Sequence, residues 1–450
     1  MWKDKKFGVV SLGCDKNRVD SEKLLALLKG RGCTVTDDPK EAQIIVVNTC
    51  AFLESARGEA IDAVLECAEY KRTGRLEKLV VTGCLPQKFI GELFAPLTEA
   101  DVFLGIGDYE KIFDALERAY RTGERQNFVG AGTDAFRAER VLTTPVHYAY
   151  LKIADGCNNF CTYCLIPKIR GRYRSYPMED LVKEAEGLGE LSELIVVAQD
   201  TTRYGQDLYG ENRFVSLLRA LSALDNIRAI RLLYCYPDVI GDELIDEIAR
   251  NGKIVKYIDI PLQHSEDGVL RRMNRKGSRE SYLALLQKLR ERVPGIAIRS
   301  TFIAGFPGET EEDFEGLRSF LREAKLTNCG FFAYSREPDT AAAKMPAQIH
   351  PSSKRRRVRL LYETQRPISE AFLSSFVGKE IDVLCDGIDY DKNCFFGRAY
   401  FSAPDIDGKV YFNAREAVQG EVYRVKIARA DSYDLYGAAE DFGGDVPPED

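Results

Sequence analysis

The chain has 450 residues, of which 45% are hydrophobic and 30% are charged, values typical of a soluble globular protein with room for several domains. It lacks the run of about 18 apolar residues that a membrane span needs, and its lysine-rich start precedes too short an apolar stretch for a signal peptide. We therefore expect a cytoplasmic protein whose twelve cysteines indicate metal binding or catalysis rather than disulfides.

The formal charge is unevenly distributed. The whole chain carries −7, whereas residues 371–450 alone hold 16 acidic and 8 basic side chains, a net charge of −8. The rest of the chain is therefore close to neutral. An acidic C-terminal segment of this kind repels phosphate backbones and attracts basic partners.

The first 120 residues alternate predicted strands and helices. Short apolar runs predict strands at Phe7–Leu12, Ile44–Val47 and Leu79–Thr82, with helical patterns at Asp20–Lys29 and Glu54–Glu66. This alternation predicts a doubly wound parallel sheet with helices on both faces.

A cysteine follows each of these three strands: Cys14, Cys50 and Cys84. The carboxyl ends of parallel strands meet at one pole of a sheet, where ligands bind. Three thiols in consecutive units can therefore converge on a metal cluster, although a free cysteine at a strand end is also a common buried packing residue. Cys33 and Cys67, which follow no strand, are interpreted as packing residues.

The polar stretch 121–145 predicts a linker, and the strand Tyr148–Ile153 after it leads into a cysteine array. Cys157, Cys161 and Cys164 have the spacing C-x3-C-x2-C. Three thiolates can hold three irons of a cubane cluster and leave the fourth iron open for chemistry, whereas electron carriers use four cysteines. The alternatives are a structural zinc site and three unconnected thiols. Zinc sites usually take a second C-x2-C pair, which this sequence lacks.

About six β-α units follow, which predicts a parallel, partly closed barrel with functional residues at the carboxyl ends of its strands. Further strands are predicted at Leu194–Ala198, Ile230–Tyr234, Tyr257–Ile260, Ala297–Phe302 and Gly330–Phe332. Helices are predicted at Glu179–Leu188, Phe214–Leu224, Glu243–Arg250, Arg279–Arg292 and Glu312–Glu323.

Residues 351–375 predict one long connecting helix with a basic run. Such a run can contact nucleic acid, but on a connecting helix a solvated face is the favoured interpretation. The run consists of Lys354, Arg355, Arg356, Arg357 and Arg359.

The last 75 residues predict a small antiparallel β-barrel followed by a disordered acidic tail over residues 441–450. Turns are predicted at Asp386-Gly387 and Asp407-Gly408. The strands are predicted at Glu380–Cys385, Cys394–Tyr400, Lys409–Phe412 and Glu421–Ala428.

Together these features resemble the radical SAM superfamily and, within it, the methylthiotransferases of the RimO type. The resemblance covers about residues 5–440 and implies an N-terminal methylthiotransferase (MTTase) domain over 5–120, a radical SAM core over 143–372 and a TRAM barrel over 375–441. Asp15 stands where the RimO type usually has proline. The supporting motifs are Ser11–Glu22, Ile166–Gly171, Gln199–Gly205, Ala403–Gly408 and Tyr433–Gly437.

The resemblance implies two 4Fe–4S clusters, one on each cysteine trio, together with S-adenosylmethionine and a one-electron reductant such as flavodoxin. One S-adenosylmethionine molecule would yield a carbon radical strong enough to take hydrogen from an unactivated carbon, and a second would methylate the sulfur that is inserted. The implied product is a methylthio group on the β-carbon of an aspartate in the twelfth protein of the small ribosomal subunit.

The remaining site residues are expected around the cluster on Cys157, Cys161 and Cys164 and at the carboxyl ends of the strands of the β/α barrel. Glycines of the run Gly305–Glu309 would let the backbone approach a ligand, although a plain strand-to-helix turn explains the same residues. His264 is as consistent with a structural as with a catalytic histidine, and no catalytic side chain is assigned beyond the clusters. The predicted cofactor-binding residues are Phe160, Tyr163, Gln199, Asp200, Gln263, Gly305, Gly308 and Glu309.

The charge of the terminal barrel favours a basic ribosomal protein as substrate, because a barrel that binds tRNA should be basic. The alternatives are a tRNA adenosine methylthiotransferase with the same chemistry and a two-cluster electron carrier, which would need no second-substrate pocket. For each candidate partner-binding residue, simple solvation of a surface acid is an equal alternative. Those candidates are Asp382, Asp386, Asp389, Asp405 and Asp407.

Overall fold

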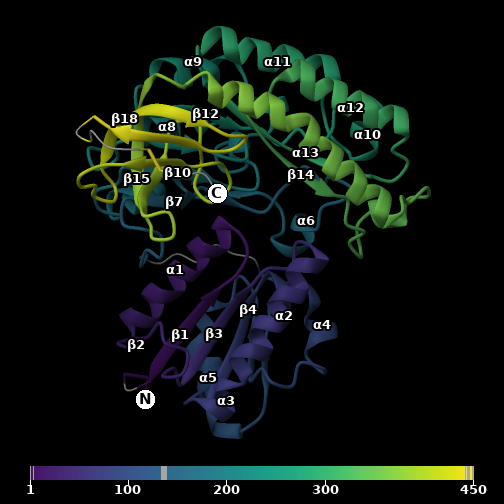
Figure 1. The fold of residues 1–450 in the computed structure, drawn as a ribbon. Coiled ribbons are helices and arrows are strands. Elements are labelled where there is room, and N and C mark those ends of the chain that lie inside the picture. Colours follow the sequence, from purple (N-terminus) through teal and green to yellow (C-terminus); the bar gives the residue numbers. More distant parts are fainter. Residues whose placement is uncertain (1, 4, 133–138, 441, 443–445, 448–450) are drawn as a thin grey trace. The chain divides into compact units, whose positions relative to one another are not determined.

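The computed structural model of the chain contains two parallel sheets and one small closed barrel (Figure 1). It describes residues 2–3, 5–132, 139–440, 442 and 446–447, so part of the predicted linker and most of the predicted acidic tail lie outside the described residues. No helix in the described part of the chain is long and apolar enough to cross a membrane.

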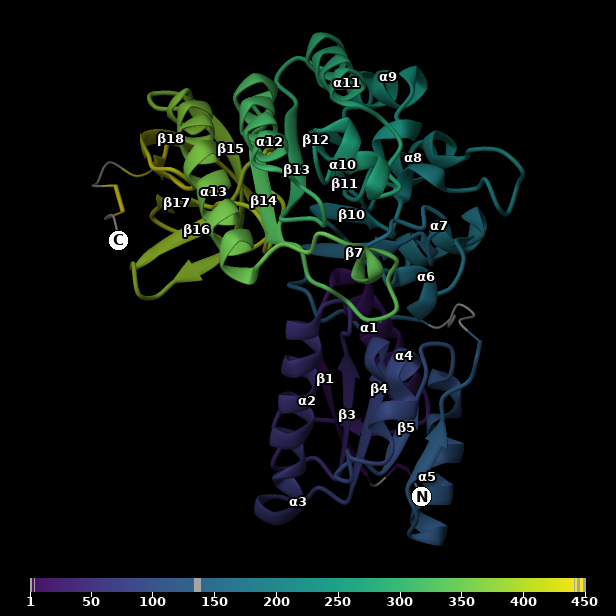
Figure 2. The same cartoon turned by 90° about the vertical axis from the view of Figure 1, so that its right-hand side faces the viewer.

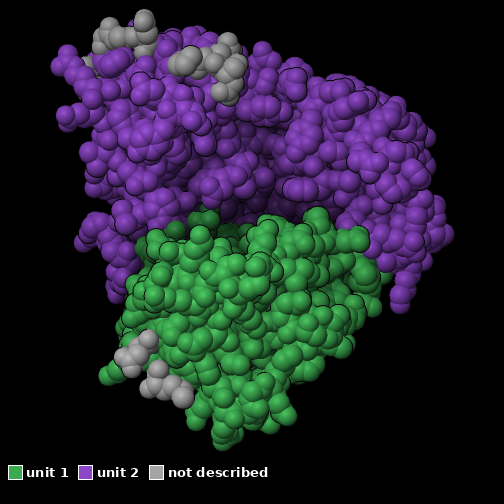
Figure 3. Space-filling view, turned by 60° about the horizontal axis from the view of Figure 1, so that its bottom comes forward, with its two compact units in different colours: residues 1–143, 150–184, 337–340 green, residues 144–149, 185–336, 341–450 purple. Residues whose placement is uncertain are grey.

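The chain divides into two compact units (Figure 3). Unit 1 contains residues 1–143, 150–184 and 337–340. Unit 2 contains residues 144–149, 185–336 and 341–450. The segment that bears the C-x3-C-x2-C array therefore belongs to the same compact unit as the N-terminal sheet.

Unit 1 is built on six parallel strands in the order β2-β1-β3-β4-β5-β6. The order changes direction between β1 and β3, which is the kind of switch point where open α/β sheets bind ligands. The strands are β1 (Lys6–Ser11), β2 (Thr34–Val35), β3 (Ile44–Thr49), β4 (Lys78–Gly83), β5 (Val102–Leu104) and β6 (Gln126–Phe128).

Helices cover both faces of this sheet (Figures 1 and 2). Alternating side chains of its strands pack into two separate cores, as a doubly wound sheet requires. Ile44 and Val46 of β3 face the core covered by α1 and α5, whereas Ile45 and Val47 face the core covered by α2. The helices are α1 (Asp15–Gly30), α2 (Glu54–Ala68), α3 (Tyr70–Thr73), α4 (Cys84–Leu93) and α5 (Ile112–Thr122), with the 3-10 turn η1 (Tyr109–Lys111) before α5.

Two differences from the predicted elements have physical causes. Helix α1 begins at Asp15 rather than Asp20, because its first turns face buried polar groups that an apolar period does not reveal. The interpretation of residues 121–145 as a linker is wrong at β6, which adds a three-residue edge strand to the sheet.

Unit 1 also contains residues 150–184, which begin within β7 (Tyr148–Lys152), and the short segment 337–340. The short strands β8 (Ala154–Asp155) and β9 (Arg174–Ser175) pair antiparallel, and the cysteine array and α6 (Ile166–Ile169) lie between them. Helix α7 (Met178–Glu186) follows.

The main sheet of unit 2 has the strand order β14-β13-β12-β11-β10, with β7 next to β10. Each strand pair for which the register is given, from β10 to β14, is parallel, which confirms the predicted partial β/α barrel. The strands are β10 (Glu193–Val197), β11 (Ile230–Leu232), β12 (Ile254–Asp259), β13 (Ala297–Ala304) and β14 (Asn328–Ala333). The helices and 3-10 turns between and after them are η2 (Thr201–Arg203), α8 (Phe214–Ser222), η3 (Pro237–Val239), α9 (Asp242–Arg250), α10 (Asp267–Arg272), α11 (Arg279–Arg292), α12 (Glu311–Ala324) and η4 (Ala342–Lys344).

Helix α13 (Pro351–Ser374) connects this sheet to the terminal barrel, as predicted. The expectation that its basic run is solvated is wrong for Lys354 and Arg357, which are buried and three residues apart on one face of the helix. The Lys354 ammonium donates to the carbonyl of Tyr334 at 2.9 Å. Arg355, Arg356 and Arg359 are exposed.

The barrel closes in the order β15-β16-β17-β19-β18. The predicted turn at Asp386-Gly387 is wrong, because β15 runs through both residues and a bulge between Cys385 and Gly387 absorbs the irregularity. The barrel strands are β15 (Glu380–Asp389), β16 (Cys394–Arg398), β17 (Val410–Asn413), β18 (Val422–Ala430) and β19 (Leu435–Ala439), the last of which was not predicted.

Candidate functional site

The first cysteine trio lies where β1, β3 and β4 end. These strands are neighbours in the sheet, and their register pairs Ser11 with Asn48 and Thr49 with Gly83. Cys50 and Cys84 are the next residues after the second pair, and Cys14 stands at the start of α1. The predicted convergence of the three strand ends is therefore present in the fold of unit 1.

Close backbone packing brings the three thiols together. A Cβ atom on Gly13, beside Cys14, would lie 2.6 Å from the Cβ of Cys50. Gly83, beside Cys84, has a φ of 95°, and a Cβ there would lie 2.6 Å from the carbonyl oxygen of Thr49. Only glycine tolerates both the backbone conformation and the contact at residue 83, so this residue sets how closely the ends of β3 and β4 approach.

Neighbouring thiols also affect the pKa values of Cys50 and Cys84. Burial raises the pKa of the Cys84 thiol to about 12, and the neighbouring thiols of Cys14 and Cys50 act in the same direction. Burial also raises the pKa of Cys50, with a further contribution from Cys14. Buried thiols such as Cys50 and Cys84, whose ionisation is disfavoured, are suited to a metal group that displaces their protons when it binds, as an iron–sulfur cluster does.

The second trio lies in the loop between β8 and α6. The N–H of Asn159 donates to the sulfur of Cys157 at 3.5 Å, and the N–H of Ile166 donates to the sulfur of Cys164 at 3.4 Å. The N–H of Cys164 donates to the carbonyl of Cys161 at 3.0 Å, which closes a tight turn. Hydrogen bonds from backbone N–H groups to sulfur are a recurrent feature around iron–sulfur clusters.

Two aromatic residues of this loop were predicted to flank the cluster. Phe160 has a φ of 47° and is 48% exposed, and the guanidinium of Arg172 lies 5.8 Å from its ring. Tyr163 is half-buried. Their positions on the array are consistent with packing around a cluster, and Phe160 in addition presents an open face.

The donor chemistry of unit 1 fits two clusters. All six cysteines are free thiols within one compact unit, and each trio stands on a tight backbone framework. Within the described residues, no three His, Cys, Asp or Glu side chains are arranged to hold a single metal ion. A cubane cluster takes each cysteine on a different iron, so its ligand sulfurs lie farther apart than the ligands of one ion.

Unit 1 also contains a group of buried charged side chains that the sequence patterns did not predict. Arg170, Lys152, Asp20 and Asp155 are each at most 3% exposed. The Arg170 guanidinium donates to both oxygens of Asp155 at 3.0 and 3.1 Å and lies 3.8 Å from the sulfur of Cys84. The one indication in the sequence was the run of polar residues in the first turns of α1, which lie in line with the apolar face of that helix and could have been predicted to be buried.

Unit 2 places three of the predicted cofactor-binding residues just beyond strand ends. Gln199 and Asp200 follow β10, and the buried Oε1 atom of Gln199 has no hydrogen-bond partner among the described residues. Asp200 accepts hydrogen bonds from Thr202 and Arg203 and so shapes its own turn. Gln263, with a φ of 73°, exchanges backbone hydrogen bonds with Thr301 and Ile303 of β13.

The predicted loop Gly305–Glu309 connects β13 to α12, and its role as a helix start is confirmed. Thr310 caps α12 by accepting from the N–H of Asp313. One oxygen of Glu309 accepts from the N–H groups of Gly305 and Phe306 at 2.7 and 3.1 Å, and the other accepts from Arg357 at 2.8 Å. Glu309 is 4% exposed, so its carboxylate holds the loop in shape.

Two neighbours complete this loop. The N–H of Gly308 donates to the carbonyl of Ala347 at 3.0 Å, and Arg272 donates to the carbonyl of Gly308 at 3.1 Å. The Nε2 atom of His264 is buried, lacks a hydrogen-bond partner among the described residues and lies 3.6 Å from the Glu309 carboxylate.

The five candidate acids of the barrel differ in availability. Asp386 accepts from Arg398 and contacts His147 at 2.9 Å, and the buried side chain of Asp407 accepts from Tyr257 at 2.7 Å. Asp389 accepts from backbone N–H groups of its own turn. Asp382 and Asp405 are exposed, and Asp382 pairs with Arg424 across the strands at 2.9 Å.

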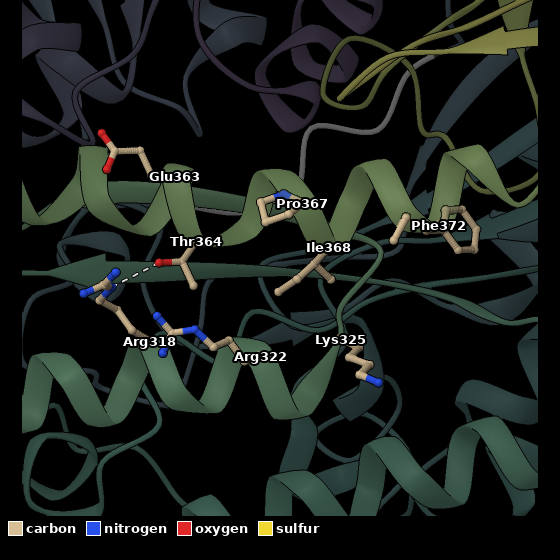
Figure 4. A pocket seen from close by; sticks show the side chains of 9 residues that line it. Arg318, Arg322, Lys325, Glu363, Thr364, Pro367, Ile368 and Phe372 are labelled. Carbon is tan, nitrogen blue, oxygen red and sulfur yellow. Dashed lines mark hydrogen bonds between the residues drawn. The ribbon is translucent and has the colours of Figure 1, made fainter.

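A separate pocket of about 690 Å³ lies on unit 2 between α12 and α13 (Figure 4). Arg318 and Arg322 of α12 face Thr364 and Ile368 of α13, and Arg318 donates to the Thr364 hydroxyl at 3.1 Å. None of the predicted site residues lines this pocket, so it is not the candidate active site.

The sequence of the chain matches known families and proteins along almost its whole length. Residues 6–105 match the model described as "Uncharacterized protein family UPF0004", residues 151–321 the radical SAM superfamily and residues 377–439 the TRAM domain. The chain is 47% identical over 440 residues to the "Ribosomal protein uS12 methylthiotransferase RimO" of Clostridium tetani (strain Massachusetts / E88), which covers 97% of this chain and 98% of that protein. The chain belongs to the RimO family of methylthiotransferases. It is also 46% identical over 435 residues to the protein of that name from Lachnoclostridium phytofermentans, covering 96% of this chain and 99% of the relative.

Membership of the RimO family makes the chain a radical SAM enzyme with S-adenosylmethionine and 4Fe–4S clusters as its cofactors. A solved structure of the cobalamin-dependent S-adenosylmethionine radical enzyme OxsB has a TM-score of 0.52 and 13% identity to this chain. The match covers 75% of this chain and 54% of OxsB, and it supports the fold alone.

Proposed function

We propose that this enzyme attaches a methylthio group to the β-carbon of an aspartate in a small-subunit ribosomal protein, the class of substrate in the names of its RimO relatives. One observation carries the proposal. Two cysteine trios lie in one compact unit, one at three neighbouring strand ends and one in the C-x3-C-x2-C loop.

We assign Cys14, Cys50 and Cys84 to one 4Fe–4S cluster, and we assign the other cluster to the loop trio of Cys157, Cys161 and Cys164. When bound, the two clusters and S-adenosylmethionine supply the one-electron chemistry and the carrier for sulfur that amino-acid side chains lack. The protein's contribution is to hold the trios, to neutralise their charge and to keep water away.

The residues around the trios are suited to these tasks. Backbone N–H groups of Asn159 and Ile166 donate to the loop sulfurs and so offset thiolate charge. Leu165 and Ile169 are each 1% exposed and pack in the same apolar cluster as Cys84. A dry, apolar lining of this kind protects reactive species from water and strengthens electrostatic interactions within the site.

In unit 2, we propose that the strand ends bind S-adenosylmethionine. The Oε1 atom of Gln199 offers an acceptor that the described residues leave unpaired, and Gln263 lies beyond the end of β12, which is separated from β10 by β11. Glu309 acts by shaping the loop that contains Gly305 and Gly308. These assignments follow from positions at carboxyl ends of parallel strands, where barrels of this kind bind their ligands.

We propose that the exposed acids Asp382 and Asp405 of the barrel attract the basic ribosomal protein and that tRNA is not a substrate. A barrel with excess negative charge disfavours a polyanion, since phosphate neutralisation dominates tRNA affinity. We propose that a one-electron reductant such as flavodoxin supplies the electron. The proposed location is the cytoplasm, where ribosomes assemble.

Mass spectrometry of the ribosomal protein tests the proposal. Protein isolated from cells with the gene should carry one additional methylthio group on the peptide that contains the aspartate, and protein from cells without the gene should not. Complementation with Cys33→Ala, a buried cysteine outside both trios, should restore the modification, whereas Cys84→Ala should not. An unmodified aspartate in cells with the gene, or a methylthio group on tRNA instead, would refute the assigned substrate.

A further inference from the structure

Arg170 is buried beside Cys84 of the N-terminal trio and beside Asp155, in the segment that leads into the loop trio. It follows α6 and is 1% exposed. Its Nη1 atom donates to both oxygens of Asp155, which stands two residues before Cys157. Its Nη2 atom donates to the Oδ1 of Asn17 at 2.6 Å and to Asp20 at 3.1 Å, and it lies 3.8 Å from the Cys84 sulfur.

Asn17 extends this contact to the other two cysteines of the N-terminal trio. Its Nδ2 atom donates to the carbonyl of Leu12, two residues before Cys14, at 3.0 Å. The same amide donates to the carbonyl of Thr49, directly before Cys50, at 2.9 Å. The Cys84 thiol in turn donates to the Oδ1 of Asn17 at 3.7 Å. One arginine–asparagine pair therefore touches the backbone or sulfur at all three strand ends.

The charges in this buried group balance before any cluster is counted. Arg170 and Lys152 are the cations, and Asp20 and Asp155 are the anions; Lys152 donates to both carboxylates. Loss of the guanidinium would leave one uncompensated negative charge next to the Cys84 thiolate. An uncompensated buried charge is strongly unfavourable, and it would oppose the addition of an electron to a cluster there.

We propose that Arg170 is a positioning residue for the cluster on Cys14, Cys50 and Cys84. It fixes that trio relative to the loop of Cys157 through Asn17 and Asp155, and it keeps the buried charged group beside Cys84 neutral. The planar fork of arginine serves these acceptors at once, which the single ammonium of lysine cannot do. Residues that hydrogen-bond to metal ligands typically change metal affinity about 10–100-fold when they are replaced.

This inference rests on the ligand sets proposed above, and the test separates the two. The full chain with Cys157, Cys161 and Cys164 replaced by Ala should retain only the N-terminal cluster after anaerobic reconstitution. Redox titration followed by electron paramagnetic resonance then reports that cluster alone. A background that holds no cluster would overturn both the ligand assignment and the role of Arg170.

In that background, Arg170→Gln should shift the midpoint potential to more negative values and weaken iron retention against a chelator about 10–100-fold. Arg170→Lys should keep the potential closer to that of the background but still weaken iron retention, and it decides the question if Arg170→Gln does not fold. Arg231→Gln is the matched control, because Arg231 is 2% exposed and paired with Glu193 far from any predicted cysteine ligand in the sequence.

The control distinguishes positioning from stability alone. Both Arg170→Gln and Arg231→Gln should lower the unfolding temperature of the metal-free chain, since each breaks a buried ion pair. Only the Arg170 variants should change the potential or the iron retention. If Arg170→Gln and Arg170→Lys leave both quantities unchanged while the unfolding temperature falls, Arg170 is merely structural and the proposal is wrong.

Discussion

Glu309 illustrates how much a single side chain depends on distant residues. The sequence places it at a strand end beside two glycines, which predicts contact with a cofactor. In the structure its carboxylate is taken up by the N–H groups of Gly305 and Phe306 and by Arg357, which lies 48 residues farther along the chain. Its role in shaping the loop could not be predicted, because no local pattern indicates that partner.

We predict that Glu309→Gln lowers the free energy of unfolding by about 3 kcal/mol, because it leaves the Arg357 guanidinium buried without its closest anion. It should also raise the KM for S-adenosylmethionine while the iron content stays unchanged. Denaturant titration and steady-state kinetics measure the two effects.

Glu311→Gln is the matched control for this change. Glu311 pairs with the same arginine at 3.0 Å, but its side chain is 55% exposed, so its loss should cost less than about 1 kcal/mol. Equal losses of stability from the two variants would show that burial does not govern this site.

Among the elements, the terminal barrel is held to the sheet of unit 2 by buried ion pairs. Glu193, the first residue of β10, pairs with Arg231 of β11 and with Arg398 of β16. Burial alone would raise the pKa of Glu193, but these two arginines outweigh it and lower that pKa to about 2. The barrel strand β16 is thus anchored by a carboxylate that stays ionised in acid.

This shift has a defined effect on stability. The unfolded carboxyl has a pKa near 4.5, so the folded state binds fewer protons between pH 2 and 4.5. The stabilisation, about 3 kcal/mol, should be fully present above pH 4.5 and should disappear as the pH falls through 4.5 toward 2. Denaturant titrations of the metal-free chain at pH 6, 4 and 3 should show this loss, and Glu193→Gln should abolish it. Glu243→Gln, at an exposed position, should retain the pH dependence of the parent. If Glu193→Gln lost as much stability between pH 6 and pH 3 as the parent, Glu193 would not be the residue responsible.

The segment 337–340 contacts three helices of unit 1 that begin at or after a cysteine of the trios: α2, α4 and α6. The buried Glu337 accepts from the N–H of Glu54 at the start of α2 and from Arg57, at 2.9 and 2.5 Å. Asp339 pairs with Lys88 of α4 at 2.6 Å, and its carbonyl accepts from Lys168 of α6 at 2.7 Å. We predict that Glu337→Gln lowers the unfolding free energy by about 3 kcal/mol and reduces the iron bound after reconstitution.

The matched control for this segment is Glu66→Gln, which removes an exposed acid from the same helix α2. It should change the free energy of unfolding by less than about 0.5 kcal/mol and should leave the iron content as in the parent. If Glu66→Gln also loses iron, or if Glu337→Gln binds as much iron as the parent, this segment does not have the role that we assign to it.

For the molecule as a whole, the classes of fold and the strands that precede Cys14, Cys50 and Cys84 could be predicted from the sequence, because both follow from local patterns. Strands such as Ile44–Thr49 are apolar throughout, and cysteines directly after them must lie at the sheet's carboxyl edge. Strands β5 and β6 have three residues each, which is too short for a recognisable alternation of apolar and polar residues. Arg170 and Asn17 escaped prediction because their partners come from segments about 150 residues apart.

The acidic surface of the barrel gives a prediction at this scale. Asp382→Asn combined with Asp405→Asn should weaken binding of the basic ribosomal protein about 2- to 10-fold at low salt, mainly through slower association. Asp62→Asn combined with Glu66→Gln on α2 removes two exposed acids elsewhere and should have no such effect. Surface plasmon resonance at two salt concentrations would measure both, and equal affinities for the parent and the barrel variant would contradict this surface assignment.

Iron analysis after anaerobic reconstitution tests the two-cluster account most directly. The parent chain should hold about eight irons, and replacement of either trio by alanine, at Cys14, Cys50 and Cys84 or at Cys157, Cys161 and Cys164, should leave about four. A parent that holds only four irons, or a triple variant that keeps all eight, would contradict the account.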